Sequence, residues 1–344
     1  MGFDKHNKLY QEDLDFILGV KRIETLKGKS ILITGATGMV GVCLIDALMK
    51  LNEKGNAAIS IYAVGRDRNK ATERLGEYYS NPLFHFLEQD VRQPFPEDIV
   101  VDFIIPLASN THPLAYSKFP VETIEINVKG AEYALIKARQ CGASVLYPSS
   151  VEVYGNGEEV FDENCTGNLN LASSRSCYTE SKRVSEALCQ SFLAEYGVDC
   201  KIVRLSRLFG PTMLMSDTKA SSQFILKALA KENIVLKSKG NQVFSYTYVA
   251  DAVQAILFVM LNGENGQAYN IACDSCNVRL ATFAQTCADL SGKEVVFDLP
   301  SEVESRGYSV ASKAVMSTKK LAAIGWSSYR TFEDALNRTV SILK

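Results

Sequence analysis

The chain has 344 residues, of which 47% are hydrophobic and 22% charged, and this composition is ordinary for a globular protein with a full hydrophobic core. Its net charge of −2 gives no basic excess, which excludes a protein built mainly to bind duplex nucleic acid. No apolar run approaches the length that spans a bilayer, and the first residues lack a signal-peptide core. We therefore expect a cytoplasmic protein without membrane or nucleic-acid partners.

The nine cysteines are scattered through the chain, and an odd number in apolar surroundings is typical of reduced thiols. Cys273 and Cys276 have C-x-x-C spacing, with Cys287 as the nearest further thiol, and the chain contains three histidines. Because a zinc site needs two more ligands than this pair supplies, we predict structural cysteines and no metal.

In chain order, residues 3–27 come first, and their spaced apolar positions predict a helical segment. Short, continuous apolar runs then alternate with segments of helical period. The runs predicted as strands are 30–34, 59–64, 84–87, 103–105, 144–147 and 201–205. Such runs are typical of parallel strands covered on both faces, and helices between them indicate βαβ units. The sequence therefore predicts an α/β fold with a doubly wound parallel sheet.

Two connecting segments, 121–138 and 184–196, carry apolar residues at steps of three and four. This spacing predicts helices with an apolar stripe along one face. The stripes fit packing on the sheet and packing against a second copy of the chain equally well. The second interpretation predicts a homodimer.

Beyond residue 206 the alternation becomes irregular, with strands predicted at 234–236 and 295–299 and helices at 281–291 and 331–343. We predict a larger first domain at 1–206 and a smaller C-terminal α/β domain for the substrate at 207–344. Segment 246–272 is expected to return to the sheet of the first domain.

A glycine-rich turn follows the first predicted strand and opens the next helix. Without side chains the backbone can approach a pyrophosphate, and its amides and the helix dipole stabilise the negative charge. This context predicts a dinucleotide site, and hence a Rossmann-type NAD(P)-binding domain at 1–206. The cofactor-binding residues predicted in the turn are Gly35, Thr37, Gly38, Met39, Val40 and Gly41.

The ends of the following strands supply further cofactor-binding candidates, because ligands bind at the carboxyl ends of such strands. Arg66 follows the second strand, where an acidic side chain would bind the ribose of NAD and an arginine would accommodate the phosphate of NADP. The sequence therefore does not decide between NAD and NADP as the cofactor. The other predicted cofactor-binding residues are Asp90, Val91, Leu107, Ala108, Ser109 and Asn127.

Tyr178 and Lys182 lie four residues apart in a predicted helix, so both are expected to point at one site and to contact the cofactor. A tyrosine with its ordinary pKa of about 10 is a poor base at neutral pH, and we expect the nearby ammonium to lower that pKa. Ser150, at the end of the fifth strand, is placed to bind the same substrate hydroxyl. These three residues are predicted to be catalytic.

With these motifs the chain resembles the extended short-chain dehydrogenases/reductases, a family of NAD-dependent nucleotide-sugar epimerases, dehydratases and decarboxylases. The matching positions are Gly35, Gly38, Gly41, Ser150, Tyr178, Lys182 and 248–251. Segments 113–124, 150–155 and 209–226 look most like UDP-glucuronate decarboxylases. The resemblance implies that NAD takes the C4 hydride of a nucleotide-linked sugar while Tyr178 takes the hydroxyl proton. The resulting 4-keto sugar then reacts and is reduced again.

The resemblance adds Glu152 to the catalytic residues, and the predicted substrate-binding residues are Ser109, Glu152 and Arg207. Val151 replaces an aspartate of related 4,6-dehydratases, which argues against dehydration. Phe244 replaces an arginine of the decarboxylases, and Arg207 replaces an asparagine at the diphosphate, where it can bind phosphate bidentately. We favour a UDP-glucuronate decarboxylase-like enzyme. The alternatives are a 4-epimerase, an NADPH-linked reductase and a non-catalytic NAD(P)-binding protein.

Overall fold

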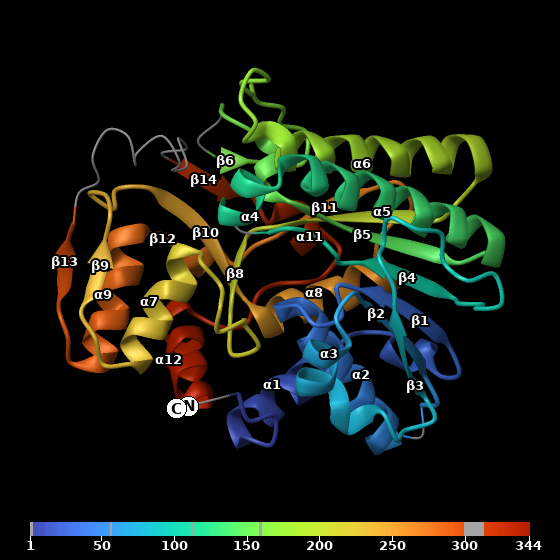
Figure 1. The fold of residues 1–344 in the computed structure, drawn as a ribbon, viewed down its shortest axis with the longest axis horizontal. Helices are drawn as coiled ribbons and strands as arrows, with labels where there is room; N and C mark the ends of the chain where they lie inside the picture. Colours follow the sequence, from blue (N-terminus) through green and yellow to red (C-terminus); the bar gives the residue numbers. More distant parts are fainter. Residues whose placement is uncertain (1–2, 56, 112, 158–159, 299–312) are drawn as a thin grey trace.

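The computed structural model describes residues 3–55, 57–111, 113–157, 160–298 and 313–344. In these residues the centre of the protein is a seven-stranded parallel sheet with the order β11-β7-β5-β4-β1-β2-β3 (Figure 1). Its strands are β1 (Ser30–Thr34), β2 (Ser60–Gly65), β3 (Phe84–Glu88), β4 (Phe103–Pro106), β5 (Ser144–Ser150), β7 (Cys200–Leu205) and β11 (Ala268–Ile271). The predicted doubly wound parallel sheet is confirmed.

Most residues of these strands are apolar because both faces of the sheet are covered. In β1, Ile31 and Ile33 belong to one buried cluster, whereas Leu32 belongs to the cluster on the opposite face. Successive side chains of a strand point to opposite faces, so a strand buried on both sides shows no polar alternation. This explains the continuous apolar runs in the sequence.

Helices cover the two faces of the large sheet as separate layers (Figure 1). One layer contains α5 (Pro120–Cys141) and α6 (Ser176–Tyr196), which pack against each other. The other layer contains α1 (Lys8–Leu18), α2 (Met39–Gly55) and α8 (Val249–Asn262), which also contact one another. The shorter helices α3 (Arg68–Leu75) and α4 (Pro113–Lys118) follow β2 and β4 along the chain.

The helix ends follow local sequence signals. Pro120 stands in the first turn of α5, where its missing amide hydrogen costs nothing, and Gly142 ends the helix with a φ of +69°. The predicted segment 3–27 is divided: α1 ends at Leu18, and a short 3-10 helix, η1, spans Ile23–Leu26. The cap at Gly19, whose amide donates to the Phe16 carbonyl, stops α1.

The apolar stripe predicted on 121–138 is only partly buried. Val121 is 70% and Ile124 44% exposed, whereas Leu135 is 1% exposed. In the same turns of the helix, Thr123 is 0% and Ile126 4% exposed. Val121 and Ile124 therefore lie on the outer face of α5, away from the face that packs on the rest of the protein.

The second part of the fold is a smaller sheet with the order β12-β10-β14-β6, to which β8 adds by pairing with β10. Its strands are β6 (Val160–Phe161), β8 (Arg207–Phe209), β10 (Val243–Tyr248), β12 (Asn277–Arg279) and β14 (Lys313–Met316). A separate pair consists of β9 (Ile234–Leu236) and β13 (Val295–Phe297). The helices of this part are α7 (Ala220–Leu229), α9 (Leu280–Ser291), α11 (Lys319–Ala323) and α12 (Phe332–Leu343). Leu299, the last residue of the strand predicted at 295–299, lies outside the described residues.

The two sheets exchange segments of the chain. Strand β11 joins the large sheet beside β7, and β6 belongs to the smaller sheet although it precedes β7 in sequence. The division into domains at residue 206 stays a prediction. Among the described residues, no helix is both long and apolar enough to cross a membrane.

Candidate functional site

The strand order locates the most favourable ligand position at the carboxyl ends of β1 and β4. From β1 the chain builds outward through β2 and β3, and it then crosses to β4 on the other side of β1. Ligands of doubly wound sheets bind in the crevice at such a reversal. The glycine turn leaves β1 at this point, and the Ala108 amide after β4 donates to the Thr34 hydroxyl oxygen at 3.0 Å.

The glycine turn is packed so closely that side chains have no room at two positions. A Cβ atom on Gly35, which has a φ of +63°, would lie 2.8 Å from the Ala108 nitrogen, and one on Gly41 would lie 2.5 Å from the Gly35 carbonyl oxygen. The amide of Val42 donates to the carbonyl of Gly38, which leaves the earlier amides of α2 without helical acceptors. Exposed amides at a helix start fit a pyrophosphate, so the residues present fit NAD. The predicted turn residues Thr37, Met39 and Val40 lie in this same segment.

A chain of hydrogen bonds connects the end of β4 to the helix that carries Tyr178. Ser109 Oγ donates to Asn127 Oδ1 at 2.7 Å, and Asn127 Nδ2 donates to Ser181 Oγ at 2.8 Å. Ser181 Oγ in turn donates to the backbone carbonyl of Tyr178 at 2.8 Å. The structure therefore brings the predicted residues Leu107, Ala108, Ser109 and Asn127 to the same side of the site as Tyr178.

The predicted residues at the ends of β2 and β3 lie at the outer part of this edge. Arg66 is exposed and donates to Glu122 Oε1 on α5 at 2.6 Å. Asp90 forms an ion pair with Arg92, with an N–O distance of 2.7 Å, and hydrogen bonding to that guanidinium lowers the pKa of the aspartate. Val91 is buried against α5, where Gly130 leaves room for its side chain.

The predicted catalytic residues come together from β5 and α6. Ser150 ends β5, and Tyr178 and Lys182 lie in the first two turns of α6. Burial raises the pKa of Tyr178 to about 12, the Ser150 hydroxyl lowers it, and the negative charge of Glu152 raises it further. Burial lowers the pKa of Lys182 to about 8.

The expectation that Lys182 lowers the pKa of Tyr178 is therefore wrong. The ammonium of Lys182 donates to the Pro148 carbonyl at 2.9 Å and lies 5.0 Å from the centre of the Tyr147 ring. Burial is the largest cause of the change in the pKa of Tyr178, and the pKa is raised and not lowered. The spacing of four residues predicted a common helix face correctly, but it carried no information about burial.

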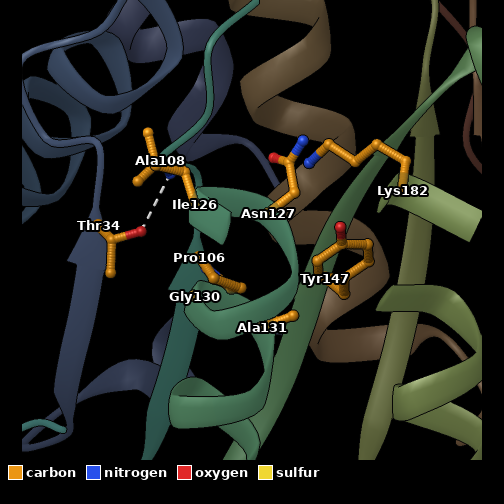
Figure 2. Close-up of a pocket in the computed structure, with 9 residues that line it drawn as sticks. All are labelled: Thr34, Pro106, Ala108, Ile126, Asn127, Gly130, Ala131, Tyr147 and Lys182. Atoms are coloured by element: carbon orange, nitrogen blue, oxygen red, sulfur yellow. Dashed lines mark hydrogen bonds between the residues drawn. The ribbon is translucent and has the colours of Figure 1, made fainter. Parts of the chain in front are cut away.

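A small pocket is lined in part by the Lys182 side chain. Figure 2 shows the ends of the Lys182, Asn127 and Tyr147 side chains directed toward one another, between the end of β4, α5 and α6. The Tyr147 hydroxyl is buried without a hydrogen-bond partner. Gly130 and Ala131 of α5 line the same pocket.

Glu152 and Arg207 form the opposite wall of the site. Glu152 follows the end of β5, and Arg207 follows the end of β7, which pairs with β5 up to Ser150 and Leu205. Their side chains approach to 3.6 Å between Arg207 Nη2 and Glu152 Oε1, and both are partly exposed. The structure therefore places two of the three predicted substrate-binding residues, Glu152 and Arg207, at the neighbouring carboxyl ends of β5 and β7.

Two residues at the site were not predicted from the sequence. Tyr116 on α4 stacks near Tyr178, with ring centroids 5.3 Å apart, and burial raises its pKa well above the usual value. Ser181 joins Asn127 to Tyr178 as described above. Its position one helical turn after Tyr178 was a usable signal, whereas the approach of Tyr116 depends on the packing of α4 against α6.

The paired cysteines lie apart from these groups. Cys273 and Cys276 are buried, and their thiols contact the Arg330 carbonyl oxygen at 3.3 and 3.8 Å. In the part of the chain that the structure describes, no group of three or more histidine, cysteine, aspartate or glutamate side chains could hold a metal ion.

Comparisons with known proteins identify relatives over most of the chain. UDP-glucuronic acid decarboxylase 1 of Xenopus tropicalis is 31% identical over 322 residues, which cover 93% of this chain and 73% of that protein. UDP-glucuronic acid decarboxylase 3 of Arabidopsis thaliana is 35% identical over 238 residues, which cover 69% of this chain and 67% of that protein.

Solved structures share the fold. UDP-glucuronic acid 4-epimerase of Bacillus cereus, in complex with UDP-glucuronic acid and NAD, has a TM-score of 0.78 and 18% identity, and the match covers 91% of this chain and 98% of that one. For UDP-glucose 4-epimerase of Thermotoga maritima the TM-score is 0.76 and the identity 21%, with the same coverage. The family model described as the NAD dependent epimerase/dehydratase family matches residues 31–272, which is most of the chain. These matches confirm the prediction that the protein is an NAD-dependent enzyme that modifies nucleotide sugars. The chain belongs to the NAD dependent epimerase/dehydratase family.

Proposed function

We propose that this enzyme decarboxylates a nucleotide-linked uronic acid, with UDP-glucuronate as the best substrate. The similarity to two UDP-glucuronic acid decarboxylases over at least two thirds of the chain supports this substrate class. The observation that carries the proposal is that Ser150 and Glu152, at the carboxyl end of β5, both act on the phenol of Tyr178. The site thus combines a hydroxyl, a phenol and a carboxylate.

The side chains divide the proton transfers among them. NAD⁺, held at the glycine turn by the free backbone amides at the start of α2, would supply the hydride acceptor for the sugar C4 and the hydride donor for its later reduction. Tyr178 accepts the proton of the C4 hydroxyl, and Ser150 holds the oxygen of that hydroxyl in place. Since burial raises the pKa of Tyr178 to about 12, its ordinary state at neutral pH is the phenol, and the phenolate must be formed within the complex.

Decarboxylation follows from the ketone at C4. The C6 carboxylate of the oxidised sugar is β to that ketone, so breaking the C5–C6 bond releases carbon dioxide and moves the electron pair onto the C4 oxygen. The Tyr178 and Ser150 hydroxyls are hydrogen-bond donors for the resulting enolate. Water supplies the proton that C5 then takes up in place of the carboxylate, and Tyr178 returns its own proton to the C4 oxygen when C4 is reduced.

The product of UDP-glucuronate tests this function. Purified enzyme is incubated with UDP-glucuronate, and the nucleotide sugars are separated and weighed by mass spectrometry. We expect a product lighter by the mass of carbon dioxide, with no net consumption of NAD. A product of unchanged mass but different retention would show 4-epimerisation instead, and would contradict decarboxylation.

We also propose that the enzyme is a homodimer that pairs the α5–α6 layers of two copies. The support is the exposed apolar surface of this layer, where Val121 is 70%, Ile124 44% and Val184 45% exposed. Analytical ultracentrifugation tests the association, with a dimer expected for the natural chain and a monomer for a Val121→Lys, Val184→Lys double variant. A monomeric natural chain at micromolar concentration would contradict it.

We retain the proposal of a cytoplasmic location, which the nine free cysteines support. Fractionation of the source cells with an antibody against the enzyme tests it. We expect the enzyme in the cytoplasmic fraction with its thiols reduced, and recovery from another fraction would contradict the proposal.

A further inference from the structure

The guanidinium of Arg207 is held in a fixed position by the smaller sheet. Arg207 opens β8, and its register partner on β10 is Tyr246, so Phe244 lies two residues away on the same face of the neighbouring strand. The guanidinium carbon of Arg207 lies 3.7 Å from the centre of the Phe244 ring. This stacking attracts the cation and covers one of its faces, and it leaves the N–H groups in the guanidinium plane free to bind.

Among the residues that the structure describes, one edge of this guanidinium has no hydrogen-bond partner. Nε and Nη2 of Arg207 are both buried from solvent and unpaired, although the whole side chain is 26% exposed. These two nitrogens form the side-on fork that matches the two oxygens of a carboxylate. The nearest anion, Glu152 Oε1, lies 3.6 Å from Nη2, which is too long for a hydrogen bond. Buried donors without acceptors are costly, so the fork is suited to an anionic ligand.

The surroundings of Arg207 indicate which anion it binds. Tyr116 experiences the charges of both Glu152 and Arg207, and its ring lies 5.3 Å from that of Tyr178, the proposed base for the C4 hydroxyl. In a uronic acid the carboxylate at C6 is attached to C5, the direct neighbour of C4. The diphosphate is attached to C1, on the opposite side of the sugar ring. Arg207 Nη2 lies 3.6 Å from Glu152 Oε1, and Glu152 follows Ser150, the residue proposed to hold the C4 hydroxyl, by two positions, so the guanidinium faces the C4–C5 side of the sugar.

We infer that Arg207, stacked on Phe244, binds the sugar carboxylate through its Nε–Nη2 edge and selects acidic over neutral nucleotide sugars. This inference rests on the proposed function, and it assigns Arg207 to the carboxylate rather than to the diphosphate. Because the carboxylate leaves as neutral carbon dioxide, the contact is stronger in the substrate complex than after bond breaking. Arg207 therefore contributes to binding, and its loss raises KM more than it lowers kcat.

The test compares the binding of two nucleotide sugars that differ at C6. Isothermal titration calorimetry measures the Kd of UDP-glucuronate and UDP-glucose for the natural enzyme, Arg207→Met and Arg207→Lys. We expect the natural enzyme to prefer UDP-glucuronate by about 30-fold, from the usual strength of a charge-assisted, bidentate hydrogen bond. Arg207→Met should lose this preference while binding UDP-glucose unchanged, and Arg207→Lys should retain only part of it, because lysine lacks the fork.

Arg175→Met is the matched control, because Arg175 also lies beside Tyr116, 5.8 Å from the ring centre, without stacking on Phe244. It should keep the preference for UDP-glucuronate. If Arg207→Met weakens both ligands equally, Arg207 binds the diphosphate and the inference is wrong. If Arg207→Met or Arg207→Lys prefers UDP-glucuronate over UDP-glucose as strongly as the natural enzyme does, the inference is also wrong. If the preference depends on Arg207 but no carbon dioxide is released, the inference stands and decarboxylation fails.

Discussion

Replacing Lys182 with methionine is expected to stabilise the folded protein at pH 7 and to abolish turnover. Lys182 is 4% exposed, and burial lowers its pKa from 10.5 to about 8. The lowered pKa corresponds to ~3 kcal/mol by which the folded protein disfavours the charged lysine. Methionine has a similar volume and no charge, but it leaves the Pro148 carbonyl unpaired, which costs about 1–2 kcal/mol. The net gain is about 1–2 kcal/mol in the free energy of unfolding.

The gain in the free energy of unfolding of Lys182→Met should disappear at high pH, whereas a gain from better packing would not depend on pH. Between pH 8 and 10.5 the unfolded natural chain holds the Lys182 proton more tightly than the folded one. The free energy of unfolding of the natural protein therefore rises with pH through this window, while that of Lys182→Met lacks this contribution. Urea denaturation at pH 7 and pH 9.5 measures both proteins.

Tyr178→Phe is the control, because it alters the same helix one turn away and keeps Lys182. It should retain the pH dependence of the natural protein. The buried-charge explanation is wrong if the free energy of unfolding of Lys182→Met is lower than that of the natural protein by the same amount at pH 7 and at pH 9.5.

Three further changes test other parts of the site. Tyr178→Phe should abolish turnover yet leave bound NAD unchanged by mass spectrometry of the released cofactor; retained turnover would rule out Tyr178 as the base. Gly41→Ala should reduce NAD occupancy at least tenfold, since its Cβ would lie 2.5 Å from the Gly35 carbonyl oxygen, and unchanged occupancy would mean that the pyrophosphate lies elsewhere. Glu122→Ala removes the hydrogen-bond acceptor of Arg66 and should therefore tighten NADP binding several-fold. Fluorescence titration measures the Kd of NADP, and Glu125→Ala is the control. Equal NADP affinity in both variants would show that Arg66 does not face the 2′-phosphate.

The parts of the site that depend on local order were predictable from the sequence. The glycine turn between β1 and α2, Ser150 at the end of β5, and Tyr178 with Lys182 on α6 each follow from residue spacing within one strand–helix unit. Spacing along the sequence determines which side chains share a face, because a helix and a strand have fixed periods. The parallel sheet was predictable for the same reason.

Contacts between elements distant in sequence were not predictable. The stack of Arg207 on Phe244 arises from the parallel pairing of β8 with β10, and the ion pair of Arg66 with Glu122 joins β2 to α5. Neither pairing leaves a signal in either segment alone. The raised pKa of Tyr178 was missed because its largest cause is burial, which depends on the whole packed structure.

The most direct test of the proposed function follows the carbon atom that the reaction removes. UDP-glucuronate labelled with ¹³C at C6 is incubated with the enzyme as purified, without added cofactor, and the gas phase and nucleotide sugars are measured together by mass spectrometry. We predict one equivalent of labelled carbon dioxide for each unlabelled product, over many turnovers per bound NAD. Label that stays entirely in a nucleotide sugar after the substrate has been converted would contradict decarboxylation.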